Sequence, residues 1–163
     1  MITHTEDASW PNNWLEPAQI SQLKAVIAAC FAGISSDDYY QKYFANADMF
    51  KRELRLFYAN DKIVGYCLFA YEKLANNVLA RASAGFYPEY RHGSQTLAFT
   101  VQQSLKYWLT HPWQRIYFAD TMLSPAMYRA IAKNTGIIWP HPHHPAPEKI
   151  FDLFNSDGEL SSA

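Results

Sequence analysis

The stretch from Val78 to Leu109 constrains the fold most, because it combines a strand, a polar turn and a helix in immediate succession. The residues from Val78 to Phe86 have β-type character, and this strand is expected to end before Pro88. Apolar residues then recur at a spacing close to one face of an α-helix, at Leu97, Val101, Leu105 and Trp108. The first N–H groups of a helix have no internal partner, so the turn from Arg91 to Thr96 is a natural cradle for an anion.

Two helices and an antiparallel meander are expected before this turn. Glu16-Pro17 opens the first helix, and Gly33 is expected to end it. Ser35-Ser36-Asp37-Asp38 opens the second helix, because it offers hydroxyl caps and acids in the first turn. Three segments separated by polar turns form the strands of the meander: Glu53 to Tyr58, Ile63 to Tyr71 and Val78 to Phe86.

Shorter elements are expected after the central helix. They are a strand at Arg115 to Ala119, a helix at Ala126 to Asn134 and a strand at Ile137 to Trp139. Because a helix precedes the first of these strands, that strand should lie parallel to Val78–Phe86. The chain of 163 residues is expected to form one domain, with residues 1–15 as an N-terminal arm and 140–163 as a C-terminal tail.

The composition argues against several classes of partner. A formal net charge of -1 gives no reason to expect nucleic acid or an anionic membrane surface. No signal peptide and no run of 18 apolar residues is present, so we expect no membrane span and a cytoplasmic location. A histidine cluster near the C-terminus lies among prolines and lacks a cysteine or carboxylate at ligand spacing, so a solvated loop is favoured over a metal site: His141, His143 and His144.

The order of these elements and the run Pro88-Glu89-Tyr90-Arg91 resemble the GNAT superfamily of acyl-CoA N-acyltransferases. The family's phosphate-binding pattern would begin at Arg91, with Ser94 and Thr96 in place of the expected glycines. The resemblance covers roughly Ala18 to Trp139. It implies an α/β (α+β) fold: a mixed central sheet with an antiparallel meander, a crossover helix, a splayed parallel strand pair and helices on both faces.

The resemblance also implies acetyl-CoA or another acyl-CoA as co-substrate, with no metal. The pantetheine arm would lie in the gap between the splayed strands and contact the backbone of Ala84, Gly85 and Phe86. A glycine inside a strand fits close approach by a ligand, although a packing constraint or a bulge explains Gly85 equally well. The diphosphate would face the turn formed by Arg91, His92, Gly93, Ser94, Gln95 and Thr96.

Candidate catalytic and acceptor-binding residues follow from the same resemblance. Many members use a tyrosine on the last helix as general acid, but Ala132 stands at that position here and Tyr128 lies one turn earlier. Asp120 is the candidate base, and a turn acid is the alternative role; Glu72 and Glu53 are further carboxylates to consider. The acceptor would contact Tyr39, Tyr40 and Tyr43, for which core packing is the competing interpretation.

The sequence therefore predicts transfer of an acyl group, most simply acetyl, to the amine of a small molecule or a protein. Two alternatives remain open. The missing turn glycines and Ala132 favour a non-catalytic CoA-binding or protein-interaction module. The aromatic content of 16% would fit a tunnel for a long acyl chain. The acceptor and the oligomeric state, a homodimer included, are left undetermined by the sequence.

Overall fold

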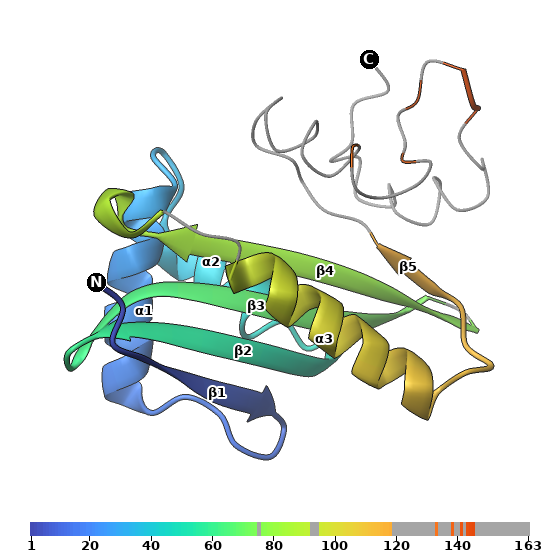
Figure 1. Ribbon diagram of the computed structural model, residues 1–163, viewed down its shortest axis with the longest axis horizontal. Coiled ribbons are helices and arrows are strands. Elements are labelled where there is room, and N and C mark those ends of the chain that lie inside the picture. Colours follow the sequence, from blue (N-terminus) through green and yellow to red (C-terminus); the bar gives the residue numbers. More distant parts are fainter. Residues whose placement is uncertain are drawn as a thin grey trace. The chain divides into compact units, whose positions relative to one another are not determined.

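The computed structural model describes residues 1–74, 76–91, 95–118, 133, 138, 141 and 143–145. The chain divides into two compact units, Met1–Phe118 and Ala119–Ala163. The first unit contains the sheet and the helices labelled in Figure 1. The predicted helix at 126–134 and the strand at 137–139 lie outside the described residues or in isolated described positions of the second unit.

The first unit is built on one five-stranded sheet with the strand order β1-β2-β3-β4-β5. Its strands are β1 (His4–Trp10), β2 (Met49–Ala59), β3 (Lys62–Leu74), β4 (Asn77–Phe86) and β5 (Ile116–Phe118). The first four strands pair antiparallel, and β5 pairs parallel to β4. The predicted meander and the parallel fifth strand are thus confirmed, and β2 and β3 are longer than expected.

The two faces of the sheet carry separate hydrophobic clusters. Along β2, Leu54, Leu56 and Tyr58 point into the cluster beneath helices α1 (Pro17–Cys30) and α2 (Ser36–Tyr43). Phe57 points into the cluster beneath α3 (Gln95–Thr110). This alternation follows from the two-residue period of a strand. Helices therefore cover both faces, with α1 and α2 on one and α3 on the other (Figure 1).

Helices α1 and α2 begin where the cap residues predict. Glu16 caps α1 in a capping box, in which its backbone N–H donates to Oε1 of Gln19 at 3.0 Å. Ser35 caps α2, and its hydroxyl accepts from the backbone N–H of Asp38 at 3.3 Å. Gly33 has φ +83°, as expected of a glycine after a helix, but α1 ends at Cys30, three residues earlier.

Residues 1–15, expected to be an arm, include the edge strand β1. This strand pairs with β2 over its whole length, from His4 opposite Tyr58 to Trp10 opposite Arg52. The polar sequence of β1 lacks the apolar alternation that predicts a strand, because an edge strand need bury little of its surface. A fork of hydrogen bonds from Arg55 to the carboxylate of Asp7, each 2.7 Å long, ties β1 to its neighbour.

The apolar stripe noted in the sequence of α3 is not the face that packs on the sheet. The side chains of Leu97, Val101, Leu105 and Trp108 are exposed, whereas Phe99, Gln103 and Tyr107 pack on the sheet. The rings of Phe99 and Tyr107 join the hydrophobic cluster on the sheet. Small, half-buried residues flank them on the same side of the helix: Thr96, Thr100 and Ser104. In addition, the Tyr71 hydroxyl donates to the backbone carbonyl of Gln103 at 3.1 Å and fixes the helix on this face.

Candidate functional site

Among the described residues, the outer edge of β4 is unpaired over its second half, called the open edge below. β5 pairs only with Val78, Leu79 and Ala80, and no described strand pairs with β4 beyond them on that side. The backbone N–H of Val78 donates toward β5, to Arg115 at 3.0 Å. Because backbone groups alternate in direction along a strand, those of Ala82 and Ala84 also face this outer edge. An extended molecule with amide groups can add there like a strand.

Gly85 is explained by packing inside the fold. It lies opposite Tyr66 in the β3–β4 ladder, so its backbone groups face β3 and not the open edge. A Cβ atom on Gly85 would lie 2.8 Å from Cε1 of Tyr66 and 3.1 Å from Sγ of Cys30. Of the three backbone positions predicted to contact pantetheine, Ala84 and Phe86 are therefore the outward ones.

The backbone carbonyl of Phe86, at the carboxyl end of β4, accepts two hydrogen bonds from side chains. Nε of Arg91 donates to it at 3.1 Å, and the thiol of Cys30 donates to it at 3.2 Å. Burial is the main cause that raises the pKa of the Cys30 thiol, against the opposing effect of Arg91. The exposed guanidinium of Arg91 is thus anchored where the strand ends and the short helix η1 (Pro88–Tyr90) leads toward α3.

The remaining residues of the predicted phosphate turn are only partly described. His92, Gly93 and Ser94 lie outside the described residues, and α3 begins at Gln95. Thr96 is half-buried in the first turn of α3, and its carbonyl accepts from the hydroxyl of Thr100 at 3.0 Å. The structure therefore places Arg91 and the start of α3 at the two ends of this turn.

Of the three tyrosines proposed to contact the acceptor, only Tyr39 reaches β4. Tyr39 and Tyr40 are 8% and 7% exposed, so both belong to the core beneath α1 and α2. The Tyr40 ring stacks on Phe44, whereas the Tyr39 hydroxyl lies 2.6 Å from the hydroxyl of Ser83 on β4. Tyr43 is half-buried, with its ring centroid 4.5 Å from that of Tyr39.

Ser83 is a candidate site residue that the sequence analysis did not consider. Its hydroxyl lies 3.1 Å from that of Tyr66, which in turn lies 3.5 Å from the hydroxyl of Tyr39. Burial keeps the pKa of Tyr66 well above its ordinary value, so this phenol stays protonated. The two-residue period of β3 and β4 could have placed Tyr66 and Ser83 on one face, but not Tyr39 beside them.

The carboxylates considered as general bases differ in position and in their partners. Asp120 and the candidate acid Tyr128 lie outside the described residues. Glu53 is buried on the α3 side of β2, with Oε1 3.1 Å from Nζ of Lys51. Glu72 lies on the same face as Tyr66, and its Oε2 accepts from Nε of Arg81 at 3.3 Å. Glu72 is thus the candidate that shares a face with Ser83.

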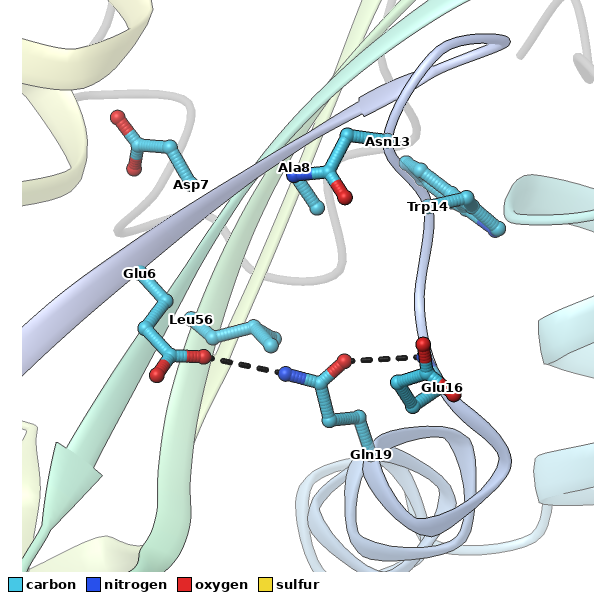
Figure 2. A pocket seen from close by; sticks show the side chains of 8 residues that line it. All are labelled: Glu6, Asp7, Ala8, Asn13, Trp14, Glu16, Gln19 and Leu56. Carbon is cyan, nitrogen blue, oxygen red and sulfur yellow. Dashed lines mark hydrogen bonds between the residues drawn. The ribbon is translucent and has the colours of Figure 1, made fainter.

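A hollow of about 220 Å³ lies at the opposite edge of the sheet, between β1 and the start of α1 (Figure 2). Figure 2 shows the Gln19 amide between Glu6 and Glu16, donating to Oε2 of Glu6 at 3.1 Å. That oxygen also accepts from the Tyr58 hydroxyl at 2.9 Å, and Asp7 is paired with Arg55. Glu6 thus ties β1 to α1 and β2, and Asp7 ties β1 to β2, so this hollow is not the candidate site.

The described residues contain no group of three or more His, Cys, Asp and Glu side chains arranged to hold a metal. Among the histidines near the C-terminus, Nδ1 of His141 accepts from the backbone N–H of His143 at 3.1 Å. No helix in the described part of the chain is long and apolar enough to cross a membrane.

Comparisons with known proteins identify the fold. No protein-family model matches the sequence, and no curated protein matches it. The solved structures that resemble it include ribosomal-protein-alanine N-acetyltransferase from Brucella melitensis biovar Abortus 2308, at 10% identity and a TM-score of 0.54, with 87% of this chain and 98% of that chain covered.

Two further structures contain bisubstrate analogues. Naa50 of Arabidopsis thaliana, in complex with CoA-Ac-MVNAL, is 18% identical with a TM-score of 0.51, and 79% of this chain and 80% of that chain are covered. AAC(6')-Iy, in complex with CoA-S-monomethyl-acetylneamine, is 9% identical with a TM-score of 0.50, at 83% and 92% coverage. The chain therefore has the GNAT fold, a mixed sheet with helices on both faces, as the sequence predicts.

Proposed function

We propose that the protein is an acyl-CoA-dependent N-acyltransferase. The observation that carries the proposal is the open edge of β4, which begins where β5 stops pairing at Ala80 and leads to Arg91 and the start of α3. Structures with this fold that hold CoA-containing bisubstrate analogues support the same conclusion. An amine acceptor is proposed because those analogues join CoA to an aminoglycoside fragment or a peptide.

Each part of this edge has a distinct proposed role. The outward backbone groups of Ala82 and Ala84 hydrogen-bond the amides of pantetheine, as a neighbouring strand would. The exposed Arg91 and the N–H groups in the first turn of α3, which have no partner within a helix, attract the diphosphate. The arm then runs toward Ala80, where β5 blocks further pairing, so the thioester comes to lie near Arg81 to Ser83.

The proposed reaction is direct attack of the neutral amine on the thioester. The amine nitrogen forms a bond to the carbonyl carbon, the carbonyl electron pair moves to oxygen, and the C–S bond breaks as that pair returns. The departing sulfur takes a proton, and the nitrogen loses one. Binding both substrates on one rigid edge supplies proximity, which is a large part of what catalysis requires.

A thermal-shift titration with CoA, acetyl-CoA and a longer acyl-CoA tests the proposal. A ligand that binds only the native state raises the melting temperature. We expect a rise that Arg91→Ala weakens. Arg115→Ala, which removes an exposed arginine immediately before β5, should leave the rise unchanged. Release of free CoA thiol in the presence of a panel of amines then measures transfer. No shift with any of the three ligands at millimolar concentration would contradict the proposal.

A further inference from the structure

The hydroxyls of Tyr39, Ser83 and Tyr66 form a triangle beside the open half of β4. Ser83 lies 2.6 Å from Tyr39 and 3.1 Å from Tyr66, and the third side, between the two phenols, is the longest at 3.5 Å. Tyr66 is fully buried and Tyr39 is 8% exposed, whereas Ser83 is half-buried. Ser83 is therefore the member of this hydroxyl triangle with access to a ligand.

The hydrogen-bond geometry of the triangle allows the Ser83 proton to turn outward. The Tyr66 hydroxyl donates to the Tyr39 hydroxyl, whereas either atom can be the donor in the two contacts of Ser83. A hydroxyl donates one hydrogen bond and accepts two. When Ser83 accepts from Tyr39, its own proton can turn from Tyr66 to a ligand beside β4. The accepted hydrogen bond also polarises Ser83 and makes it a stronger donor.

The position of Ser83 along β4 determines what it can reach. Ala80 is the last residue that pairs with β5, and Ser83 lies between the outward-facing Ala82 and Ala84. A chain added to this edge would lie about 4.8 Å from β4. The end of this added chain that lies furthest from Arg91 would lie beside Ser83. A carbonyl turned toward the α1/α2 face would then come within reach of this hydroxyl.

We propose that Ser83 donates a hydrogen bond to the carbonyl oxygen of the bound thioester, and that Tyr39 and Tyr66 position it. When the amine nitrogen bonds to the carbonyl carbon, negative charge moves onto this oxygen, and the Ser83 donor stabilises it. The proton stays on Ser83 throughout; when the C–S bond breaks, the electron pair on oxygen re-forms the carbonyl bond and the charge leaves with the sulfur. The donor is preorganised because buried tyrosines hold the serine before the substrate arrives.

This inference rests on the proposed acyl transfer, and its test separates the two. Acetyl-CoA labelled with ¹³C at the thioester carbonyl is bound to the protein in the absence of an acceptor. A hydrogen bond to the oxygen moves the carbonyl ¹³C resonance downfield relative to free acetyl-CoA. We expect this displacement in the wild type and its loss in Ser83→Ala, with unchanged affinity for CoA.

Turnover supplies the second readout. Ser83→Ala should lower kcat by about 10- to 100-fold with little change in the KM for acyl-CoA, because removal of one such donor costs transition-state stabilisation. Tyr66→Phe should lower kcat by a smaller factor, since Ser83 keeps the Tyr39 contact. Tyr71→Phe is the matched control: it removes a buried tyrosine hydroxyl from β3 on the opposite face, where that hydroxyl bonds Gln103.

The outcomes are distinct. If the wild type binds no acyl-CoA, the proposed function and this inference both fail. If it binds and turns over but Ser83→Ala keeps the ¹³C displacement and the wild-type kcat, only the role of Ser83 is overturned. A fall in kcat of the same size in Tyr71→Phe as in Tyr66→Phe would also overturn it, because the effect would then reflect stability alone.

Discussion

Gly85 and Tyr66 show how single residues shape the candidate site from within. Gly85 leaves space for the Tyr66 ring and the Cys30 sulfur, and the ring in turn brings the Tyr66 hydroxyl to Ser83. The phenol could not reach Ser83 if the ring were pushed aside. Gly85, which the sequence suggested as a ligand contact, instead leaves room for the ring that brings the Tyr66 hydroxyl to Ser83.

We expect Gly85→Ala to destabilise the protein by about 1–3 kcal/mol, because the added methyl group meets the Tyr66 ring in a packed core. Urea unfolding followed by circular dichroism measures this change. In a Tyr66→Leu background the ring carbon at 2.8 Å is absent, so the same substitution should cost less. Equal costs in the two backgrounds would show that the Tyr66 ring does not impose the requirement for glycine.

Among the secondary-structure elements, α3 and the edge of β4 define the site together. α3 packs through Phe99 and Tyr107, which directs its first turn toward the end of β4. β4 is paired with β3 along its whole length, but with β5 over only three residues. The second half of β4 is therefore held by β3 on one side, and on the other side its backbone groups can pair with a ligand.

The two faces of α3 can be compared directly. Phe99→Ala should cost about 3–5 kcal/mol, because a ring that is 1% exposed leaves a cavity. Val101→Ala on the opposite face, where the side chain is 56% exposed, should change stability by less than about 0.5 kcal/mol. Chemical unfolding of both variants is the measurement. The reverse order would mean that the sequence-predicted face is the one that packs.

Ala84→Pro tests the open edge without disturbing the β3–β4 ladder. The N–H of Ala84 faces outward, so proline removes a donor for pantetheine and no bond within the sheet. We expect the affinity for acetyl-CoA to fall at least tenfold while the urea midpoint changes little. Lys106→Ala, at an exposed position of α3, serves as the binding control. Unchanged acetyl-CoA affinity in Ala84→Pro would contradict the proposed mode of binding.

Across the described part of the molecule, buried aromatic residues pack against both faces of the sheet. Their phenols make the stability of the fold sensitive to alkaline pH. Burial raises the pKa of the Tyr66 and Tyr71 phenols above the ordinary value, and burial also raises the pKa of the Cys67 thiol to about 11. In the unfolded chain, these phenols titrate near 10 and the thiol near 9. The unfolded state therefore loses protons first as the pH rises.

The free energy of unfolding should therefore fall as the pH rises into the alkaline range. The stabilisation is fully present below about pH 9 and is lost as the pH rises toward the higher native values. Urea midpoints measured from pH 8 to 11 should therefore fall, and Tyr66 and Tyr71 should ionise only with loss of ellipticity. Tyrosinate absorbance recorded beside circular dichroism tests this. Full ionisation of all 11 tyrosines with native ellipticity retained would contradict it.

The local signals in the sequence were sufficient for most of the architecture. Cap residues predicted the starts of α1 and α2, and alternation with polar turns predicted the meander from β2 to β4. The edge strand β1 was missed because its stabilisation comes from pairing and from the Asp7–Arg55 contact, not from an apolar pattern. Of the tyrosines predicted to contact an acceptor, Tyr39 contacts β4, and its contact with an acceptor stays a prediction.

The sequence by itself determined where α1 and α2 begin and where the turns of the meander lie, because caps and turns act over a few neighbouring residues. The tertiary structure decided which face of α3 is buried, because that depends on the rings of Phe99 and Tyr107 meeting a sheet built from distant residues. It also brought Tyr39 to Ser83 and Tyr66, which lie 44 and 27 residues away along the chain. Local sequence does not encode such contacts; the packing of α2 on β3 and β4 creates them.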